Sequence, residues 1–98
     1  MLENTKMTHW QDKEEEIAMQ ELIGSYAKLI VYNDDQNTFD WVIQCFVEIC
    51  SHNTAQAEQL SYLIHFKGKA TVKTGSLKEL KPFKEALLDR GLSVVIDS

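Results

Sequence analysis

Hydrophobic and polar positions follow two different periods along the chain, and the changes of period predict where each element begins and ends. A β-rich run from Tyr26 to Tyr32 stops at residues 33–37, Asn-Asp-Asp-Gln-Asn, which are strongly suited to turns. Between Phe39 and Cys50, apolar residues recur at spacings of three and four, the pattern of an amphipathic helix. A second apolar stripe runs along the same helix, so we expect neighbours to cover it on more than one side.

Two further elements are predicted from the middle of the chain. Asn53 followed by Gln56 resembles a capping box and predicts a helix that continues to about Phe66. Its predicted core stripe contains Leu60, Leu63 and Ile64. The glycine at position 68 ends this helix, and residues 70–74 alternate well enough to form a short strand.

The last part of the chain predicts a third helix and a third strand. Residues 76–79, Ser-Leu-Lys-Glu, form another capping box, and helical spacing then continues until Gly91. Pro82 would cost about 3 kcal/mol inside a helix. We therefore expect the helix to begin near Leu80, with Pro82 in its first turn and a separate turn before it. Residues 92–96 then form the last strand.

These elements predict an α+β fold in the order strand, helix, helix, strand, helix, strand. Three strands with one apolar face, covered by three helices, make a two-layer sandwich with an antiparallel sheet. We expect a single core domain over residues 26–98 and a polar, acidic N-terminal extension over residues 1–25 that is partly flexible.

Composition and charge narrow the classes of function. The net charge of -5 and the pI near 5.1 argue against a nucleic-acid binder, because phosphate neutralisation needs clustered Lys and Arg. No stretch approaches the roughly 20 apolar residues that span a bilayer, so we expect a cytoplasmic protein without a membrane partner. Cys45 and Cys50 fall in the apolar pattern of the first helix and are expected to be reduced core residues. No heptad seam indicates a coiled-coil dimer, and we expect a monomer.

Candidate chemistry is concentrated in the loop after the first strand and in the second helix. If Asn33, Asp34 and His65 meet at one end of the sandwich, an amide oxygen, a carboxylate and a neutral imidazole could accept hydrogen bonds from a single cation. Each also has a structural explanation, as a turn or capping residue or as a half-buried helix residue. Asp34, Asp35 and His65 form the most plausible metal-ligand set but have no spacing signature, and no nucleophile motif occurs. We therefore expect no catalytic activity, no metal and no cofactor.

Two blocks of residues resemble the hallmark sequence of the ClpS family of Clp protease adaptors. The first block is Val-Tyr-Asn-Asp-Asp at positions 31–35, with Phe39 opening an apolar helix, and the second is Ile-His-Phe-Lys-Gly-Lys-Ala at positions 64–70. Either block alone is weak, whereas the two together, with matching spacing and element order, are fairly specific. The resemblance covers the region from Lys28 to Asp97, about three quarters of the chain.

The resemblance implies a non-catalytic adaptor for N-degrons, which are proteins whose first residue is bulky and apolar. It implies that Asn33, Asp34 and His65 hold the free α-amino group of the substrate. It further implies delivery of the substrate to the N-terminal domain of a ClpA- or ClpC-type ATPase, with the N-terminal extension assisting. The residues implied as the lining of the side-chain pocket are Asp35, Thr38, Phe39, His52, Ser61, Ile64 and Val94.

Several positions depart from the usual pattern of the family. Phe39 and Ser61 stand where methionines are common, and Thr38 stands where a proline is common. Residues 80–83, Leu-Lys-Pro-Phe, stand where many members carry an Ala-Glu-Thr-Lys-like stretch for ATPase docking. The size of the pocket, the preferred first residue and the partner surface therefore stay open. A docking module of the same fold without N-degron binding is the alternative function, because architecture alone implies none.

Overall fold

The computed structural model describes residues 26–98, and the predicted extension, residues 1–25, lies outside the described residues. Six elements follow one another in the predicted order, so the α+β succession is confirmed. Their bounds are β1 (Ala27–Tyr32), α2 (Phe39–Cys50), α3 (Thr54–Lys67), β2 (Lys69–Gly75), α4 (Leu77–Asp89) and β3 (Ser93–Asp97).

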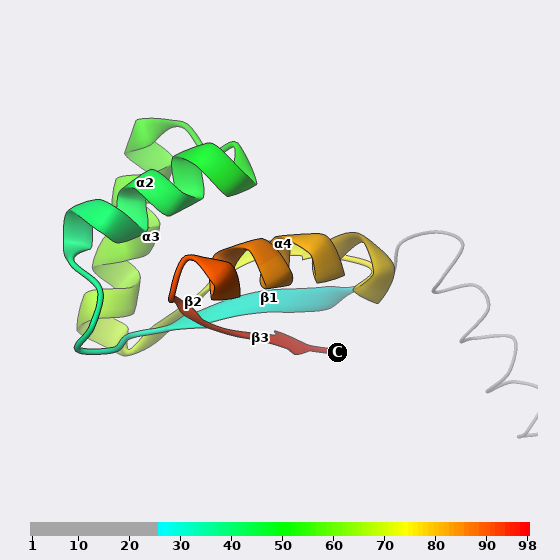
Figure 1. Cartoon of the computed structure of the whole chain (residues 1–98). Helices are drawn as coiled ribbons and strands as arrows, with labels where there is room; N and C mark the ends of the chain where they lie inside the picture. The colour runs from blue at the N-terminus through cyan, green and yellow to red at the C-terminus, as the bar shows by residue number, and fades with distance from the viewer. Residues whose placement is uncertain (1–25) are drawn as a thin grey trace, which may run out of the picture.

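The three strands form one antiparallel sheet with β1 in the centre, in the order β2-β1-β3. Val31 of β1 lies opposite Ala70 of β2 and Val94 of β3, and a register shift follows Leu29 on the β2 side. Figure 1 shows α4 lying along one face of the sheet, while α2 and α3 pack beside α4 near the end at which β1 leads into the helices. The helices therefore form the second layer of the sandwich.

Local sequence signals explain where the helices begin and end. The Thr38 hydroxyl caps α2 by accepting from the Trp41 backbone N–H at 3.1 Å. Asn53 and Gln56 form the predicted capping box of α3, which satisfies two backbone donors that have no partner inside the helix. At the other end of α3, Gly68 adopts φ 94°, a left-handed conformation that a residue without Cβ takes without strain.

The core lies between the helices and the sheet. One face of β1 contributes Leu29 and Val31, and Phe46 of α2 is fully buried against them. Ile64 of α3 joins this core as predicted, but Leu63 is 41% exposed, so its predicted core position is wrong. The reason is helical geometry, because Leu63 is turned by about 100° from Ile64, which faces the core.

The predicted start of the third helix is also wrong. The capping box of Ser76 and Glu79 opens α4 at Leu77 without a separate turn, and Pro82 lies inside the helix. Pro82 is exposed, so the carbonyl that lacks a donor at this position can bond to water. Two capping bonds and the complete burial of Leu80 offset the cost of the proline.

Two adjacent leucines in α4 test this packing. Leu87 is fully buried and Leu88 is 43% exposed, so the same substitution removes very different contacts. We expect Leu87→Ala to lower the free energy of unfolding by about 2 to 5 kcal/mol, and Leu88→Ala by less than about 1 kcal/mol. Urea unfolding followed by circular dichroism measures both, and equal losses would contradict the described packing.

Candidate functional site

The loop between β1 and α2 borders a small recess at the end of the sandwich where α3 meets the sheet. Its walls come from the end of β1, the loop, one residue each of α2 and α3, and the turn between α4 and β3. The volume is about 20 Å³, which is room for about one water molecule. The residues that line the recess are Val31, Tyr32, Asn33, Asp34, Asn37, Val42, Ile64 and Leu92.

The carboxylate of Asp34 organises the loop. Its Oδ1 accepts from the backbone N–H groups of Gln36 at 2.9 Å and Asn37 at 3.0 Å, and the Asn37 side-chain amide lies 3.0 Å from both carboxylate oxygens. The Ser93 hydroxyl of β3 donates to Oδ2 at 3.1 Å. Partial burial raises the pKa of Asp34, but these hydrogen bonds outweigh burial and hold the pKa below its ordinary value. The loop therefore keeps a negative charge beside the recess.

Asn37 fastens the loop to the turn that precedes β3. Its Nδ2 donates to the backbone carbonyl of Gly91 at 2.9 Å, in addition to its contact with Asp34. Together with the Ser93 hydroxyl bond, this contact joins the loop to the turn and to the start of β3 by two side-chain bonds. Leu92 lies between Gly91 and Ser93 and lines the recess, so these bonds fix one of its walls.

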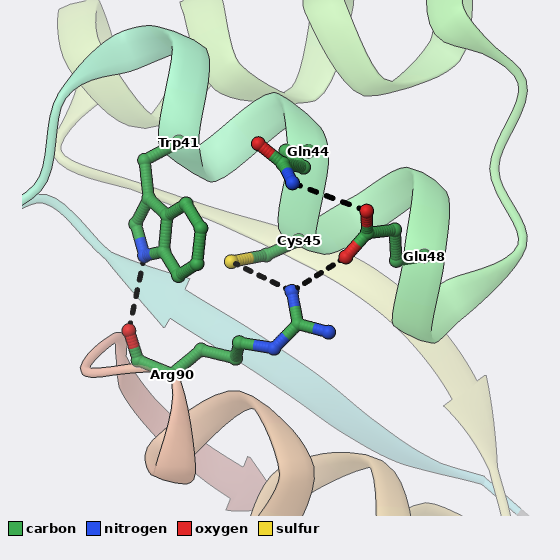
Figure 2. A network of polar contacts seen from close by, with 5 residues as sticks. All are labelled: Trp41, Gln44, Cys45, Glu48 and Arg90. Carbon is green, nitrogen blue, oxygen red and sulfur yellow. Dashed lines mark hydrogen bonds and ion pairs between the residues drawn. The ribbon is translucent and has the colours of Figure 1, made fainter.

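A polar network around Arg90 holds the same turn against α2 (Figure 2). Trp41 Nε1 donates to the carbonyl oxygen of Arg90 at 3.0 Å, and the guanidinium lies 5.5 Å from the Trp41 ring centroid. Arg90 Nη1 bonds Glu48 Oε1 at 2.8 Å and approaches Cys45 Sγ at 4.0 Å, while Gln44 Nε2 donates to Glu48 Oε2. One residue at the end of α4 thus sets the distance between α4 and the helix that contributes Val42 to the recess.

The three residues expected to bind an amine lie around this end of the fold. Asn33 and Asp34 both line the recess, and the Asn33 backbone N–H donates to Gly68 at the end of α3 at 2.9 Å. His65 lies in the last turn of α3, is exposed, and meets the ring of Phe66 edge-on. The structure therefore brings Asn33 and Asp34 together, whereas His65 is not among the residues that line the recess.

Three residues expected in the side-chain pocket lie at or near the start of α2, outside the lining of the recess. Thr38 is the helix cap, and Asp35 is an exposed loop residue. Phe39 opens α2 and is half-buried, with its ring 4.8 Å from that of Tyr62 on α3. Its ring thus packs between the two helices.

The other four expected pocket residues are divided among different environments. Ile64 lines the recess. Ser61 is buried and its hydroxyl donates to the Ala57 carbonyl at 2.8 Å, and Val94 is buried in the hydrophobic core. His52 lines a separate, open groove of about 360 Å³ between α3 and β2, together with Gln56, Gln59, Leu60, Leu63 and Val72.

Asn37, Val42 and Leu92 line the recess but were not among the expected site residues. For Val42 a signal existed, because it belongs to the apolar stripe of the helix that follows the loop. Asn37 has the Asx spacing of a loop-stabilising residue, but its bond to Gly91 joins positions 54 residues apart and leaves no local pattern. Leu92 directly precedes β3. It lines the recess because folding brings the turn before β3 against the loop after β1.

Two other kinds of chemistry, metal binding and reaction through a thiolate, depend on His, Cys, Asp and Glu side chains within residues 26–98. No three His, Cys, Asp or Glu side chains among these residues lie close enough to share a metal ion. Cys45 and Cys50 are unpaired and buried, as predicted. Burial raises the pKa of both thiols, that of Cys50 to about 11, so neither is a thiolate near neutral pH.

Comparison with known proteins places this fold and loop in one family. A family model described as "ATP-dependent Clp protease adaptor protein ClpS" matches residues 25–94. The chain belongs to the ClpS family. Among its relatives is a protein of Thermosynechococcus vestitus named "ATP-dependent Clp protease adapter protein ClpS", 35% identical over 68% of this chain and 72% of the relative. Proteins of the same name from a Nostoc and a Synechocystis species are each 34% identical to this chain over 68% of its length. The matched region covers 70% of the Nostoc protein and 69% of the Synechocystis protein.

The matched region contains all six described elements except the last residues of β3. The family name describes an adaptor, in agreement with the expected non-catalytic class. No helix within residues 26–98 combines the length and apolar character that crossing a bilayer requires.

His52 makes the stability of the fold depend on pH. Its ring packs edge-on against Phe46, and its Nδ1 is buried without a partner among residues 26–98. Desolvation lowers the pKa of His52, with a further lowering by the charge of Lys73, and both outweigh a hydrogen bond to the Val72 backbone. Between the ordinary histidine pKa, about 6.5, and this lower value, the unfolded chain binds more protons than the folded one.

We therefore expect the free energy of unfolding to fall as the pH falls from about 7 to 5, and His52→Phe to remove part of that fall. Urea unfolding at three pH values measures the dependence. Gln59→Ala is the control, because it changes an exposed, uncharged side chain of the groove that contains His52 and should keep the wild-type dependence. An unchanged dependence in His52→Phe would contradict the assigned cause.

Proposed function

We propose that this chain is an N-degron adaptor that holds the free α-amino group of a substrate at the recess. In this proposal Asn33 and Asp34 accept hydrogen bonds from the ammonium group, and His65 supplies a neutral imidazole acceptor. The side chain of the first residue enters the recess between Val42, Ile64 and Leu92. The adaptor cleaves no bond and delivers its substrate to a Clp ATPase.

The pairing of an anionic carboxylate with an unpartnered amide at the rim of the recess carries this proposal. Within residues 26–98, the exposed side chain of Asn33 has no hydrogen-bond partner, so its amide oxygen is available to a ligand. Asp34 adds a charge that its hydrogen bonds keep ionised. An ammonium group is costly to desolvate and needs such acceptors, each charge-assisted bond being worth about 1.5 to 3 kcal/mol.

Binding of a bulky first residue requires the recess to open. A cavity of about 150 Å³ accommodates a benzene-sized group, whereas the recess has about 20 Å³. The wall formed by Leu92 is tied to the loop by the Asn37 contact with Gly91 and by the Ser93 contact with Asp34. Release of these two bonds lets the loop move away from the turn before β3, which the Arg90 contacts keep against α2, and enlarges the space.

The alternative function, a docking module, is supported by the volume of the groove that contains His52, which is larger than that of the recess. The groove that contains His52 and Leu63 is about 360 Å³ and open, and it lies away from Asn33 and Asp34. A protein partner that used this groove would not depend on a free amine. The same peptide experiment therefore separates the two functions.

The proposed partner follows from the family rather than from a described contact. The relatives are named as adapters of an ATP-dependent Clp protease. We propose that the N-terminal domain of a ClpA- or ClpC-type ATPase receives this chain as a monomer in the cytoplasm. In the same proposal residues 26–98 are the binding domain and residues 1–25 assist transfer.

A pair of peptides tests amine recognition. A fluorescent peptide that begins with Leu should bind at least about tenfold more tightly than its N-acetylated form, because acetylation removes the charge and adds bulk. Fluorescence anisotropy measures both affinities. Equal affinities would contradict the adaptor proposal and favour a docking module.

Variants of the loop separate the amine contacts from loop structure. Asn33→Ala should weaken binding of the free peptide by about tenfold with little change in stability, because its side chain is exposed. Asp34→Asn should weaken it further, since it removes the charge while keeping an acceptor oxygen for the loop. Asp40→Asn is the matched control, because it removes an exposed charge outside the recess and should bind normally.

A further inference from the structure

Four aromatic rings form a continuous strip from the start of α2 to the end of α3. The Phe39 and Tyr62 ring centroids are 4.8 Å apart, and Tyr62 and Phe66 are 6.0 Å apart with ring planes only 11° from parallel. The imidazole of His65 meets Phe66 edge-on at 4.9 Å. We call these four residues the aromatic strip.

Much of the aromatic strip faces water. Tyr62 is 53% exposed and Phe66 is 72% exposed, and neither belongs to the hydrophobic core. Large aromatic side chains that are exposed together mark interaction sites more often than isolated ones do. Their rings provide a large contact area with few rotatable bonds, which limits the entropy lost on binding.

The aromatic strip reaches the rim of the recess through Phe39. Successive residues of a helix are turned by about 100°, so Tyr62 and Phe66 lie about 160° from Ile64, which lines the recess, on the outer side of α3. On α2, Phe39 lies one turn before Val42, another residue of the recess lining, and its ring contacts that of Tyr62. A peptide that leaves the recess past Phe39 therefore reaches the ring of Tyr62 next.

We propose that Tyr62 and Phe66 form a subsite for the second side chain of a bound N-terminal peptide and that this subsite favours an aromatic residue. The proposal rests on the proposed function, because it takes the first residue to be held at the recess. Adjacent Cα atoms are only about 3.8 Å apart, so the second side chain begins close to the rim of the recess. Ring-on-ring contacts there raise affinity by about two- to tenfold.

The test compares two peptides that differ only at the second position, Leu-Phe and Leu-Gly, each with a free amine and the same following residues. The wild-type protein should bind the Leu-Phe peptide about two- to tenfold more tightly in fluorescence anisotropy. The double variant Tyr62→Ser/Phe66→Ser should reduce this ratio to about one while leaving the Leu-Gly affinity unchanged. The unchanged Leu-Gly affinity, with circular dichroism, shows that the variant is folded.

Matched variants exclude a general effect of altering α3. Leu63→Ser changes an exposed apolar residue next to Tyr62 that lines the groove containing His52, and it should keep the wild-type ratio. Tyr62→Phe and Phe66→Tyr keep the rings and should also keep it. A double variant that weakened both peptides equally would overturn the subsite.

The remaining outcomes separate this inference from the function on which it rests. If the Leu-Gly peptide binds in an amine-dependent manner but the wild-type ratio is about one, the subsite is wrong and the adaptor function stands. If neither free peptide binds better than its acetylated form, the adaptor function and the subsite both fail. If sedimentation shows a dimer that the double variant abolishes, the strip is an interface between copies of the chain, and the subsite is overturned.

Discussion

The carboxylate of Asp34 joins the loop after β1 to β3, two segments that are distant in the sequence, and the candidate site depends on it. It turns the loop by accepting from Gln36 and Asn37, and it ties that loop to β3 through Ser93. Among residues 26–98, the other side-chain hydrogen bond that fixes this loop relative to the turn before β3 is that of Asn37 to Gly91. The lining of the recess is therefore set by polar contacts at its rim rather than by packing alone.

One carboxylate serves both structure and recognition because its two tasks use different properties. Its oxygens form directed bonds within the loop, while its charge acts over a longer range on anything near the rim. The bonds that organise the loop also favour the ionised form, which keeps the charge in place. Arg90 makes the turn that contains Leu92 rigid, since it holds the end of α4 against Trp41 and Glu48 of α2, whereas the loop is held to that turn by hydrogen bonds at the rim. The recess therefore has a firm wall and a wall that is held by two hydrogen bonds.

The sequence predicted the elements well because their signals are local. Capping boxes, turn residues and helical periodicity act within four residues, so they gave all six elements in order. The start of α4 failed because the general cost of Pro82 was given more weight than the capping box that opens the helix. At the site, Asn33 and Asp34 were predictable from a contiguous motif, whereas Asn37 meets Gly91 only after folding. The environment of His52 depends on how the connection between α2 and α3 packs against Phe46, and residue type does not determine this.

The small volume of the recess has an energetic consequence for any ligand that enters it. Opening the recess exchanges two rim bonds for bonds with water, at about 1 kcal/mol each, and separates Leu92 from its apolar neighbours. Burial of a leucine side chain returns only about 1.5 to 3 kcal/mol, so the first side chain alone gives little net affinity. Contacts outside the recess must then supply most of the binding free energy. The ammonium acceptors at Asn33 and Asp34 and the exposed rings of Tyr62 and Phe66 lie where such contacts can form without any further opening.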